Sequence, residues 1–311
     1  MSRAASAQPF RAIALKLAAV TLFVIMAALI KSASGRVPPG EAVFFRSFFA
    51  IPVIFGALIL RGGIRGGLRV VEPMSHVWRG LVGTTAMGLS FTGLALLPFA
   101  EVKAIQYASP LMVVIFAAMF LGEQVRAFRL TAVALGLAGV LIILSPRLGD
   151  ISAGGDRMAL GAMVVLASAI CAALAQVFVR KLVVTESTNA IVFWFSVTAS
   201  CLSLLTVPFG WVWPTSGEAA LLIGAGLLGG IAQMFATSAY RYADVSVVAP
   251  FDYASMLLAL GIGFFLFGEV PTGIMLGGTT LVVAAGVLII WRERQLGLER
   301  AKGRKVMTPQ G

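Results

Sequence analysis

The chain has 311 residues, of which 59% are hydrophobic and 12% are charged. Soluble proteins carry about 25% charged residues, so this chain has too few polar side chains to cover a water-soluble globule. The hydrophobicity also excludes a disordered chain. The net charge of +11 does not indicate nucleic-acid binding, because the charges do not belong to a soluble domain. The composition therefore predicts an all-α integral membrane protein.

Ten apolar stretches follow one another along the chain, separated by turn and charge signals. Each approaches the roughly 20 residues that a helix needs to cross the hydrocarbon layer. They fall near residues 12–33, 40–60, 77–97, 102–121, 128–145, 158–179, 188–209, 217–240, 245–267 and 272–291. The first stretch resembles a signal peptide, but Lys31 stands directly before the candidate cleavage site, which favours an uncleaved helix.

The distribution of lysine and arginine predicts the orientation, because these residues are retained in cytoplasmic loops. With the N-terminus inside, 18 of the 24 Lys and Arg residues fall in inside segments and five in outside segments. An even number of spans puts both termini on the same side. We therefore expect both termini in the cytoplasm, with residues 293–311 forming a basic cytoplasmic tail that faces anionic membrane lipids.

The chain repeats itself at an offset of about 146 residues. Residues 106–123 align with residues 252–269 and share Tyr-Ala-Ser and Gly-Glu at equivalent positions. The expected boundaries are 1–148 for the first five-helix repeat and 155–292 for the second. Because five is odd, the second repeat must lie inverted in the membrane. Inverted repeats are typical of alternating-access carriers, whose substrate site lies near the midplane between the halves.

Several motifs in these repeats resemble one known family. EAVFFR at 41–46 begins the second stretch, LGE and FGE end related stretches at 121–123 and 267–269, and RYADVSVVAPFDY spans 241–253. Over nearly the whole chain they resemble EamA-type carriers of the drug/metabolite transporter superfamily, most of all the YddG-type amino acid exporters. The resemblance implies a basket of helices in which spans 1, 3, 4, 6, 8 and 9 line a central cavity. S-adenosylmethionine carriers share these halves, so the motifs identify the fold better than the substrate.

Small and polar residues follow one face of the eighth stretch. Gly226, Gly230, Gln233, Thr237 and Tyr240 recur at spacings of three and four residues, which stacks them on one side of a helix. We expect the glycines to pack closely against a neighbouring helix. Gln233 and Tyr240 are the candidates for contact with substrate.

The fourth and ninth stretches are related by the repeat, and each contains a proline. Pro110 and Pro250 each remove a backbone hydrogen bond, and such breaks are tolerated at membrane depth mainly where protein or water satisfies the freed carbonyl. Gln106, Tyr107 and Tyr253 lie beside these breaks. Their side chains can bond an amino or carboxylate group, and tyrosine faces accept apolar side chains, which is the mix that an amino acid needs. Ordinary packing is the alternative for the two tyrosines.

Charged residues inside the stretches are few, because an ionised group at a helix centre costs about 2.5–3.5 kcal/mol on insertion scales. Asp252 is the candidate for a gate or a proton-coupling group. Lys31 and its repeat-related partner Gln176 are expected on opposite rims of the cavity, where Lys31 could attract a carboxylate. Glu41 and Arg46, five residues apart, are interpreted as a structural or gating pair.

Other features are expected to be structural. Lys103 falls near a span end and is expected at the membrane interface, and His76, the single histidine, is expected on the surface of a basic loop. Cys171 and Cys201 are expected to pack between helices, since no histidine stands near either. GAGLLG at 224–229 matches a dinucleotide fingerprint by letter, but it lies inside an apolar stretch rather than between a strand and a helix.

These features predict a carrier in a bacterial-type inner membrane that exports amino acids, neutral and aromatic ones included, through a central cavity. Uptake or exchange of S-adenosylmethionine, or of another small metabolite or drug, is the alternative. A membrane-embedded enzyme would need a nucleophile–base or metal constellation, which one loop histidine without clustered carboxylates does not provide. A purely structural role would leave the duplication unexplained. We expect no cofactor and no metal, a small-molecule substrate and lipids as partners, and leave a homodimer open.

Overall fold

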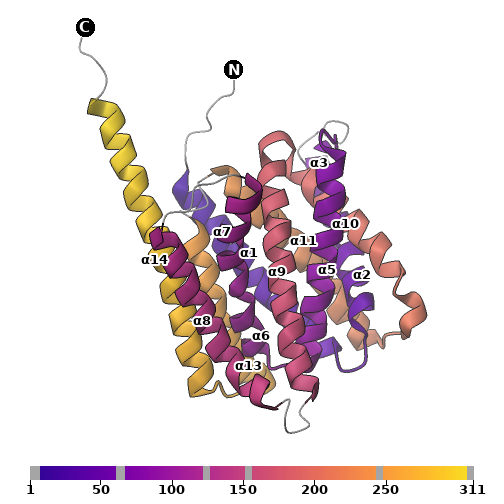
Figure 1. The fold of residues 1–311 in the computed structure, drawn as a ribbon. Helices are drawn as coiled ribbons and strands as arrows, with labels where there is room; N and C mark the ends of the chain where they lie inside the picture. Colours follow the sequence, from indigo (N-terminus) through magenta and orange to yellow (C-terminus); the bar gives the residue numbers. More distant parts are fainter. Residues whose placement is uncertain (1–7, 61–66, 122–126, 151–155, 243–247, 307–311) are drawn as a thin grey trace.

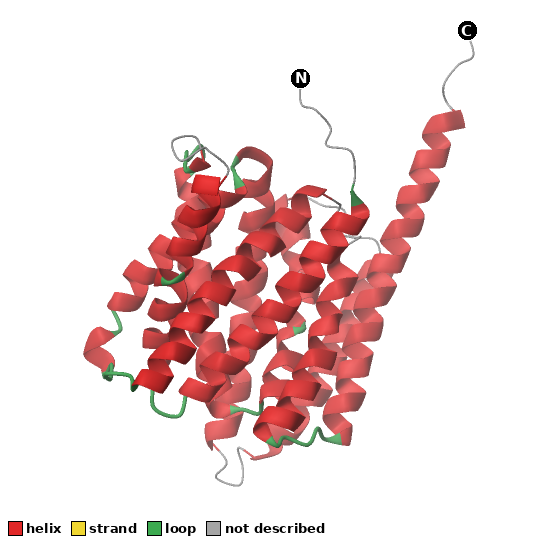
Figure 2. Cartoon of the chain, turned by 180° about the vertical axis from the view of Figure 1, so that it is seen from behind, coloured by secondary structure: helices red, strands yellow, loops and turns green. Residues whose placement is uncertain are grey.

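The computed structural model describes residues 8–60, 67–121, 127–150, 156–242 and 248–306, and every regular element in these ranges is helical (Figure 2). In chain order the elements are α1 (Pro9–Ala33), α2 (Pro39–Phe48), α3 (Ala50–Leu60), α5 (Pro73–Leu96), α6 (Phe99–Gln106), α7 (Ala108–Leu121), α8 (Ala127–Asp150), α9 (Asp156–Thr185), α10 (Thr188–Leu204), η2 (Val207–Phe209), α11 (Ser216–Tyr242), η3 (Ala249–Tyr253), α13 (Ala254–Phe267) and α14 (Gly273–Val306), where η marks a 3₁₀ turn. Each of the ten predicted stretches overlaps one helix or two consecutive ones.

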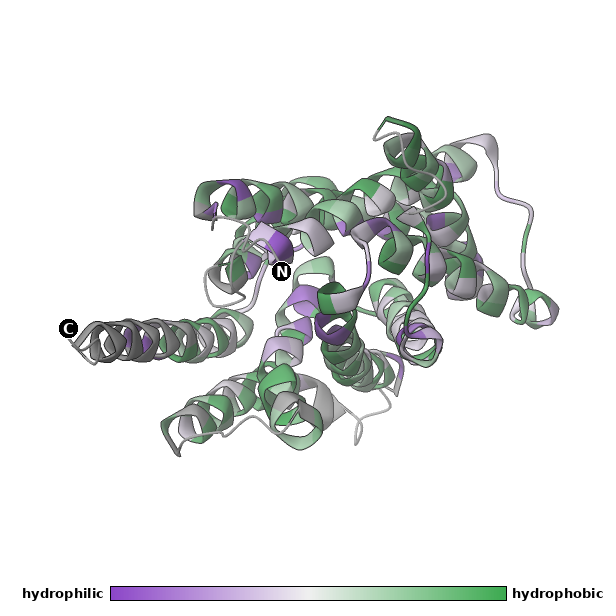
Figure 3. Ribbon diagram, turned by 90° about the horizontal axis from the view of Figure 1, so that it is seen from above, coloured by the Kyte–Doolittle hydropathy of each residue, from purple (hydrophilic) through white to green (hydrophobic). Residues whose placement is uncertain are grey.

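The outer surface of the bundle is apolar. Five helical segments of the described chain are long and apolar enough to cross a membrane: Phe10–Ala33, Pro39–Leu60, Phe99–Phe120, Arg157–Thr185 and Ser216–Tyr242. Many large hydrophobic side chains are exposed in the isolated chain, and hydrophobic colour predominates along the helices in the view of Figure 3. Such a surface needs lipid around it. The all-α membrane fold is therefore confirmed, whereas the count of ten spans and the cytoplasmic position of both termini stay predictions.

The beginning of α1 and the end of α14 lie at the same end of the bundle (Figure 1). We call this end the terminal side, which the basic residues predict to be cytoplasmic, and the opposite end the far side. Helix α14 extends beyond the rest of the bundle on the terminal side. The segment expected as a separate tail therefore begins as a direct continuation of a long helix.

Helices of the two halves pack in equivalent pairs. Helix α1 packs along α11, and α5 packs along α9; α1 and α9 begin the two halves, while α5 and α11 hold the third place in each. Helix α8 packs against α14, the last helix of each half. At this crossing a Cβ on Gly139 would lie 2.8 Å from the Gly278 carbonyl, and one on Gly278 would lie 2.7 Å from the Gly139 carbonyl. Only glycine allows the two backbones to approach so closely.

Three of the predicted stretches are divided at a single residue. Helices α2 and α3 meet at Phe49, α6 and α7 meet at Tyr107, and η3 gives way to α13 at Tyr253. Pro110 lies in the first turn of α7, where a helix has no intrahelical partner for its N–H groups. Pro250 lies within η3. The two related breaks therefore fall at the tyrosines rather than at the prolines.

Candidate substrate cavity

A cavity of about 510 Å³ lies between helices of both halves, within the size range of small-molecule sites. Most of its wall comes from α1, α5, the α6–α7 junction, α9, α11 and η3. Single residues of α2 and α10 complete the wall beside α5, and α13 and α14 contribute on the other side. The first six elements correspond to spans 1, 3, 4, 6, 8 and 9 of the sequence analysis.

Most of the polar residues singled out in the sequence line this cavity. They are Gln106, Tyr107, Gln176, Gln233, Tyr240, Asp252 and Tyr253, and Pro110 and Arg46 line it as well. Lys31 and Glu41 are not part of the lining. The side chain of Pro250 lies outside the described part of the chain.

The two repeat-related tyrosines contact each other. The ring centroids of Tyr107 and Tyr253 are 5.3 Å apart, and the Tyr107 hydroxyl lies 2.7 Å from Ser255 Oγ. The backbone carbonyls of Asp252 and Tyr253 lie 3.5 and 3.4 Å from the same hydroxyl. The junction of α6 and α7 is thereby joined to the junction of η3 and α13.

A polar chain crosses the cavity wall toward the terminal side. Lys16 Nζ pairs with Asp252 Oδ1 at 2.8 Å and donates to the Tyr240 hydroxyl at 3.1 Å. Gln176 Nε2 donates to the same hydroxyl at 2.9 Å. One contact therefore leads to the next from α9 through α11 and α1 to η3, and Asp252, the candidate gate, has a basic partner that the sequence analysis did not assign.

Lys31 was expected on the rim of the cavity, but it is not among the residues that line it. Its Nζ donates to the carbonyls of Leu97 at 2.6 Å and Leu94 at 3.4 Å, and it pairs with Glu269 Oε1 at 3.2 Å. The other oxygen of Glu269 accepts the Phe99 N–H at 2.6 Å. Leu94 lines the cavity, so this cluster lies next to the cavity on the far side and joins α1, α5, α6 and the end of α13 there. We call it the far-side clasp.

Glu41 and Arg46 do not form the pair that their spacing suggested. Five residues turn a helix by about 500°, which leaves the two side chains roughly 140° apart around the axis. Glu41 is buried and accepts the Val212 N–H at 3.1 Å, whereas Arg46 points into the cavity lining. No ion pair joins them in the described chain.

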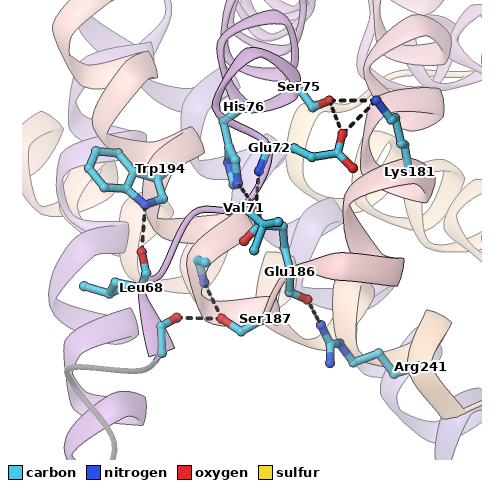
Figure 4. A network of polar contacts seen from close by, with 12 residues as sticks. Leu68, Val71, Glu72, Ser75, His76, Lys181, Glu186, Ser187, Trp194 and Arg241 are labelled. Carbon is cyan, nitrogen blue, oxygen red and sulfur yellow. Dashed lines mark hydrogen bonds and ion pairs between the residues drawn. The ribbon is translucent and has the colours of Figure 1, made fainter. Parts of the chain in front are cut away.

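His76 is buried rather than exposed, and it lies in the first turn of α5, which begins at Pro73, earlier than expected. Its Nε2 lies 3.3 Å from Glu186 Oε1, and the same oxygen accepts the N–H groups of Val71 at 2.6 Å and Glu72 at 3.0 Å (Figure 4). Burial of Glu186 opposes ionisation, but these hydrogen bonds together hold the pKa of its carboxyl below the usual value.

Further contacts extend this network on the terminal side. The guanidinium of Arg241, at the end of α11, donates to the Glu186 carbonyl, and Lys181 pairs with Glu72 at 2.7 Å. The start of α5 is thereby joined to the connection between α9 and α10 and to α11. We call these contacts the Glu186 network.

The glycines of α11 pack against the neighbouring helices. A Cβ on Gly226 would lie 2.8 Å from the Phe45 carbonyl, and one on Gly230 would lie 3.0 Å from Ala50 Cα. The segment 224–229 lies wholly inside this helix. A dinucleotide fingerprint would require it to begin after a strand.

The sequence analysis missed most of the cations of the cavity. Lys16, Arg79, Lys103 and Arg180 all line it, although Lys16, Arg79 and Arg180 were counted among the 18 inside residues that predict the orientation and Lys103 was expected at the interface. For Arg79 the signal was present in the sequence, because residue 79 falls inside the predicted stretch 77–97. Arg180 lies on a helix because α9 continues past the stretch 158–179 to Thr185. Within the described chain, no group of three His, Cys, Asp or Glu residues is placed to hold a metal ion.

Comparisons with known proteins agree on the kind of molecule. The model of the EamA-like transporter family matches residues 10–145 and 159–291. The pseudopaline exporter of Pseudomonas aeruginosa is 31% identical over 86% of this chain and 91% of its own length. The S-adenosylmethionine uptake transporter of Rickettsia prowazekii is 26% identical over 82% and 84%, and the riboflavin transporter of Rhizobium johnstonii is 29% identical over 82% of each protein. A solved crystal structure that is 24% identical covers 92% of this chain and 98% of its own, with a TM-score of 0.66, and supports the fold alone.

Proposed function

Because the chain belongs to the EamA-like transporter family, we propose that this membrane transporter exports amino acids, or metabolites built from them, by alternating access of its central cavity. The observation that carries the proposal is the lining itself. Both halves contribute hydrogen-bonding side chains, Gln106 and Tyr107 from one and Gln233 and Tyr240 from the other, around apolar wall residues. Such a mix suits a small molecule with an ionised backbone and a variable side chain.

Uptake or exchange of S-adenosylmethionine is the second candidate, since relatives carry that name. A sulfonium cation requires carboxylates around it or stacked aromatic faces. Asp252 is the one carboxylate among the described lining residues, and Lys16 already neutralises it. The charge of the wall therefore favours a substrate with a carboxylate over one with an additional cation.

Counterflow in proteoliposomes tests the proposal. Vesicles that contain the purified protein are preloaded with one unlabelled amino acid or with S-adenosylmethionine, and uptake of the labelled compound is followed. We expect accumulation with amino acids, and Gln233→Ala and Tyr253→Ala should reduce the rate without reducing the amount of inserted protein. Cys201→Ala, on the exposed face of α10, is the matched control. Accumulation with S-adenosylmethionine alone would refute the amino acid proposal.

A further inference from the structure

The cavity is lined by far more positive than negative charge. Five cations face it, Lys16, Arg46, Arg79, Lys103 and Arg180, against the single carboxylate of Asp252 in the described lining. Lys16 is the cation that pairs with Asp252. Within the described part of the chain, the other four form no ion pair.

Two of these cations meet over one aromatic ring. Arg46 of α2 and Arg79 of α5 are 3% and 6% exposed, and their Cζ atoms lie 5.6 and 3.9 Å from the ring centroid of Phe195 on α10. Arg46 Nε and Nη1 and Arg79 Nε are buried without a hydrogen-bond partner in the described chain. Two guanidinium groups therefore lie against the same ring in the buried part of the cavity wall and repel each other.

Glycines make room for both guanidinium groups. A Cβ on Gly83, one turn beyond Arg79, would collide with Arg79 Nη1 and lie 2.9 Å from the Phe195 ring. A Cβ on Gly229 of α11 would lie 3.1 Å from Arg46 Nε. The neighbouring helices are thus shaped to admit two arginine heads, although apolar side chains would fill the same space without an unpaired charge.

An unpaired charge in a dry site destabilises a protein unless an anion completes it. Arginine presents its N–H groups as a planar fork that matches the two oxygens of a carboxylate or a phosphate. Lys103 and Arg180 lie elsewhere on the same cavity wall, where they can meet a second anionic group. The structure therefore contains more anion-binding capacity than a neutral amino acid, with one carboxylate, would use.

We propose that the transported substrate is an organic anion with at least two acidic groups, one of which binds between Arg46 and Arg79. This inference rests on the proposed function, because it names the substrate class of the same cavity. Another cation of the lining, Lys103 or Arg180, holds the second acidic group, and the Phe195 ring covers the first. The acidic groups are carboxylates or phosphates, since the guanidinium fork binds either.

Thermal unfolding of the full chain in detergent tests binding separately from transport. The probes are L-glutamate, O-phospho-L-serine and L-glutamine at equal ionic strength, because glutamate and glutamine have nearly the same shape and differ by one acidic group. A bound ligand raises Tm, so we expect one or both acids to raise it and glutamine to leave it unchanged. If glutamate alone raises Tm, the acidic groups of the substrate are carboxylates. If O-phospho-L-serine alone raises it, one of them is a phosphate. Equal responses to all three probes, or to none, overturn the proposal.

Arg79→Met tests the site itself. Removing a buried cation that forms no ion pair in the described chain should raise the Tm of the ligand-free protein, and it should weaken the apparent affinity for the acid roughly tenfold to hundredfold. Gly83→Ala should weaken the affinity in the same direction by displacing the guanidinium, with all charges retained. The matched control is Arg36→Met, which removes an exposed arginine on the far side. A lower Tm for ligand-free Arg79→Met, with the response to acid intact, would make Arg79 structural and overturn the proposal.

Counterflow with the same probes distinguishes the two proposals. Counterflow of neutral amino acids without any binding of acids would support the amino acid carrier and overturn the proposal of a substrate with two acidic groups. Binding of acids at Arg79 without counterflow of any probe would keep the anion site and refute the proposed export.

Discussion

The far-side clasp provides the sharpest prediction about movement. Glu269→Gln keeps the size of the side chain and leaves an oxygen that can still accept the Phe99 N–H, but it removes the charge that pairs with Lys31 at 3.2 Å. The two side chains are 18% and 15% exposed, so water replaces the lost contact only in part. A hydrogen bond between charged groups contributes about 1.5–3 kcal/mol. If the clasp holds the far side shut, its loss raises the population open on that side by roughly 10- to 150-fold.

Accessibility of a cysteine in the cavity measures this population. Leu94→Cys, in a chain with Cys171→Ser and Cys201→Ser, places one thiol in the lining next to the clasp. A membrane-impermeant thiol reagent added outside intact cells should label it at least about tenfold faster when Glu269→Gln is present. Glu218→Gln is the matched control, because its partner Arg36 is 54% exposed and 3.9 Å away, and exposed pairs contribute little. Equal labelling rates with and without Glu269→Gln would refute the role of the clasp as a gate.

Three further predictions concern stability. Tyr107→Phe removes the hydroxyl that lies 2.7 Å from Ser255 Oγ and should lower the free energy of unfolding in mixed micelles by about 0.5–1.5 kcal/mol; Ser255→Ala, which also loses the bond to the Asp252 carbonyl, should cost less in this background than in the unmodified chain. Gly278→Val should separate α8 from α14 and cost about 1–3 kcal/mol, whereas Gly277→Val, whose Cβ meets no atom within 4 Å, should leave Tm unchanged; equal losses in both would refute the close crossing. Because the pKa of Glu186 is below its usual value of 4.5, its contribution to stability is present above that value and is lost as the pH falls through the lower, folded-state pKa. The Tm of the unmodified chain should therefore fall more steeply below about pH 5 than that of Glu186→Gln, and parallel curves would contradict this assignment.

Much of the architecture could be predicted because it follows from chain-wide patterns. The apolar composition requires a membrane, and the repeat around Tyr107 and Tyr253 requires two similar halves. The same repeat pointed to the cavity lining, since related positions near helix breaks were expected to face substrate. These inferences depend on periodicity and on duplication, neither of which needs the position of a single side chain.

The charges could not be predicted in the same way, because their meaning depends on where each helix begins and ends. Arg79 and Arg180 lie within one or two turns of the predicted span ends, where basic residues usually mark topology. In the structure α9 continues to Thr185, and Arg180 therefore lies on a helix rather than in a loop. The predicted pair of Glu41 and Arg46 was wrong for a different reason, since a spacing of five residues places them on different faces of α2.

The contact between Tyr107 and Tyr253 joins equivalent residues of the two repeats, and it has a particular consequence if these repeats are inverted, as the sequence predicts. When such a carrier changes from one open state to the other, each half adopts the conformation of the other half. The distance between two residues then changes to the distance that their repeat-related counterparts had before. If the two residues are each other's counterparts, their distance stays the same. We therefore expect the tyrosine pair, 5.3 Å apart, to keep its separation in both states, and displacements at the clasp and at the Glu186 network can be measured against it with paired spin labels.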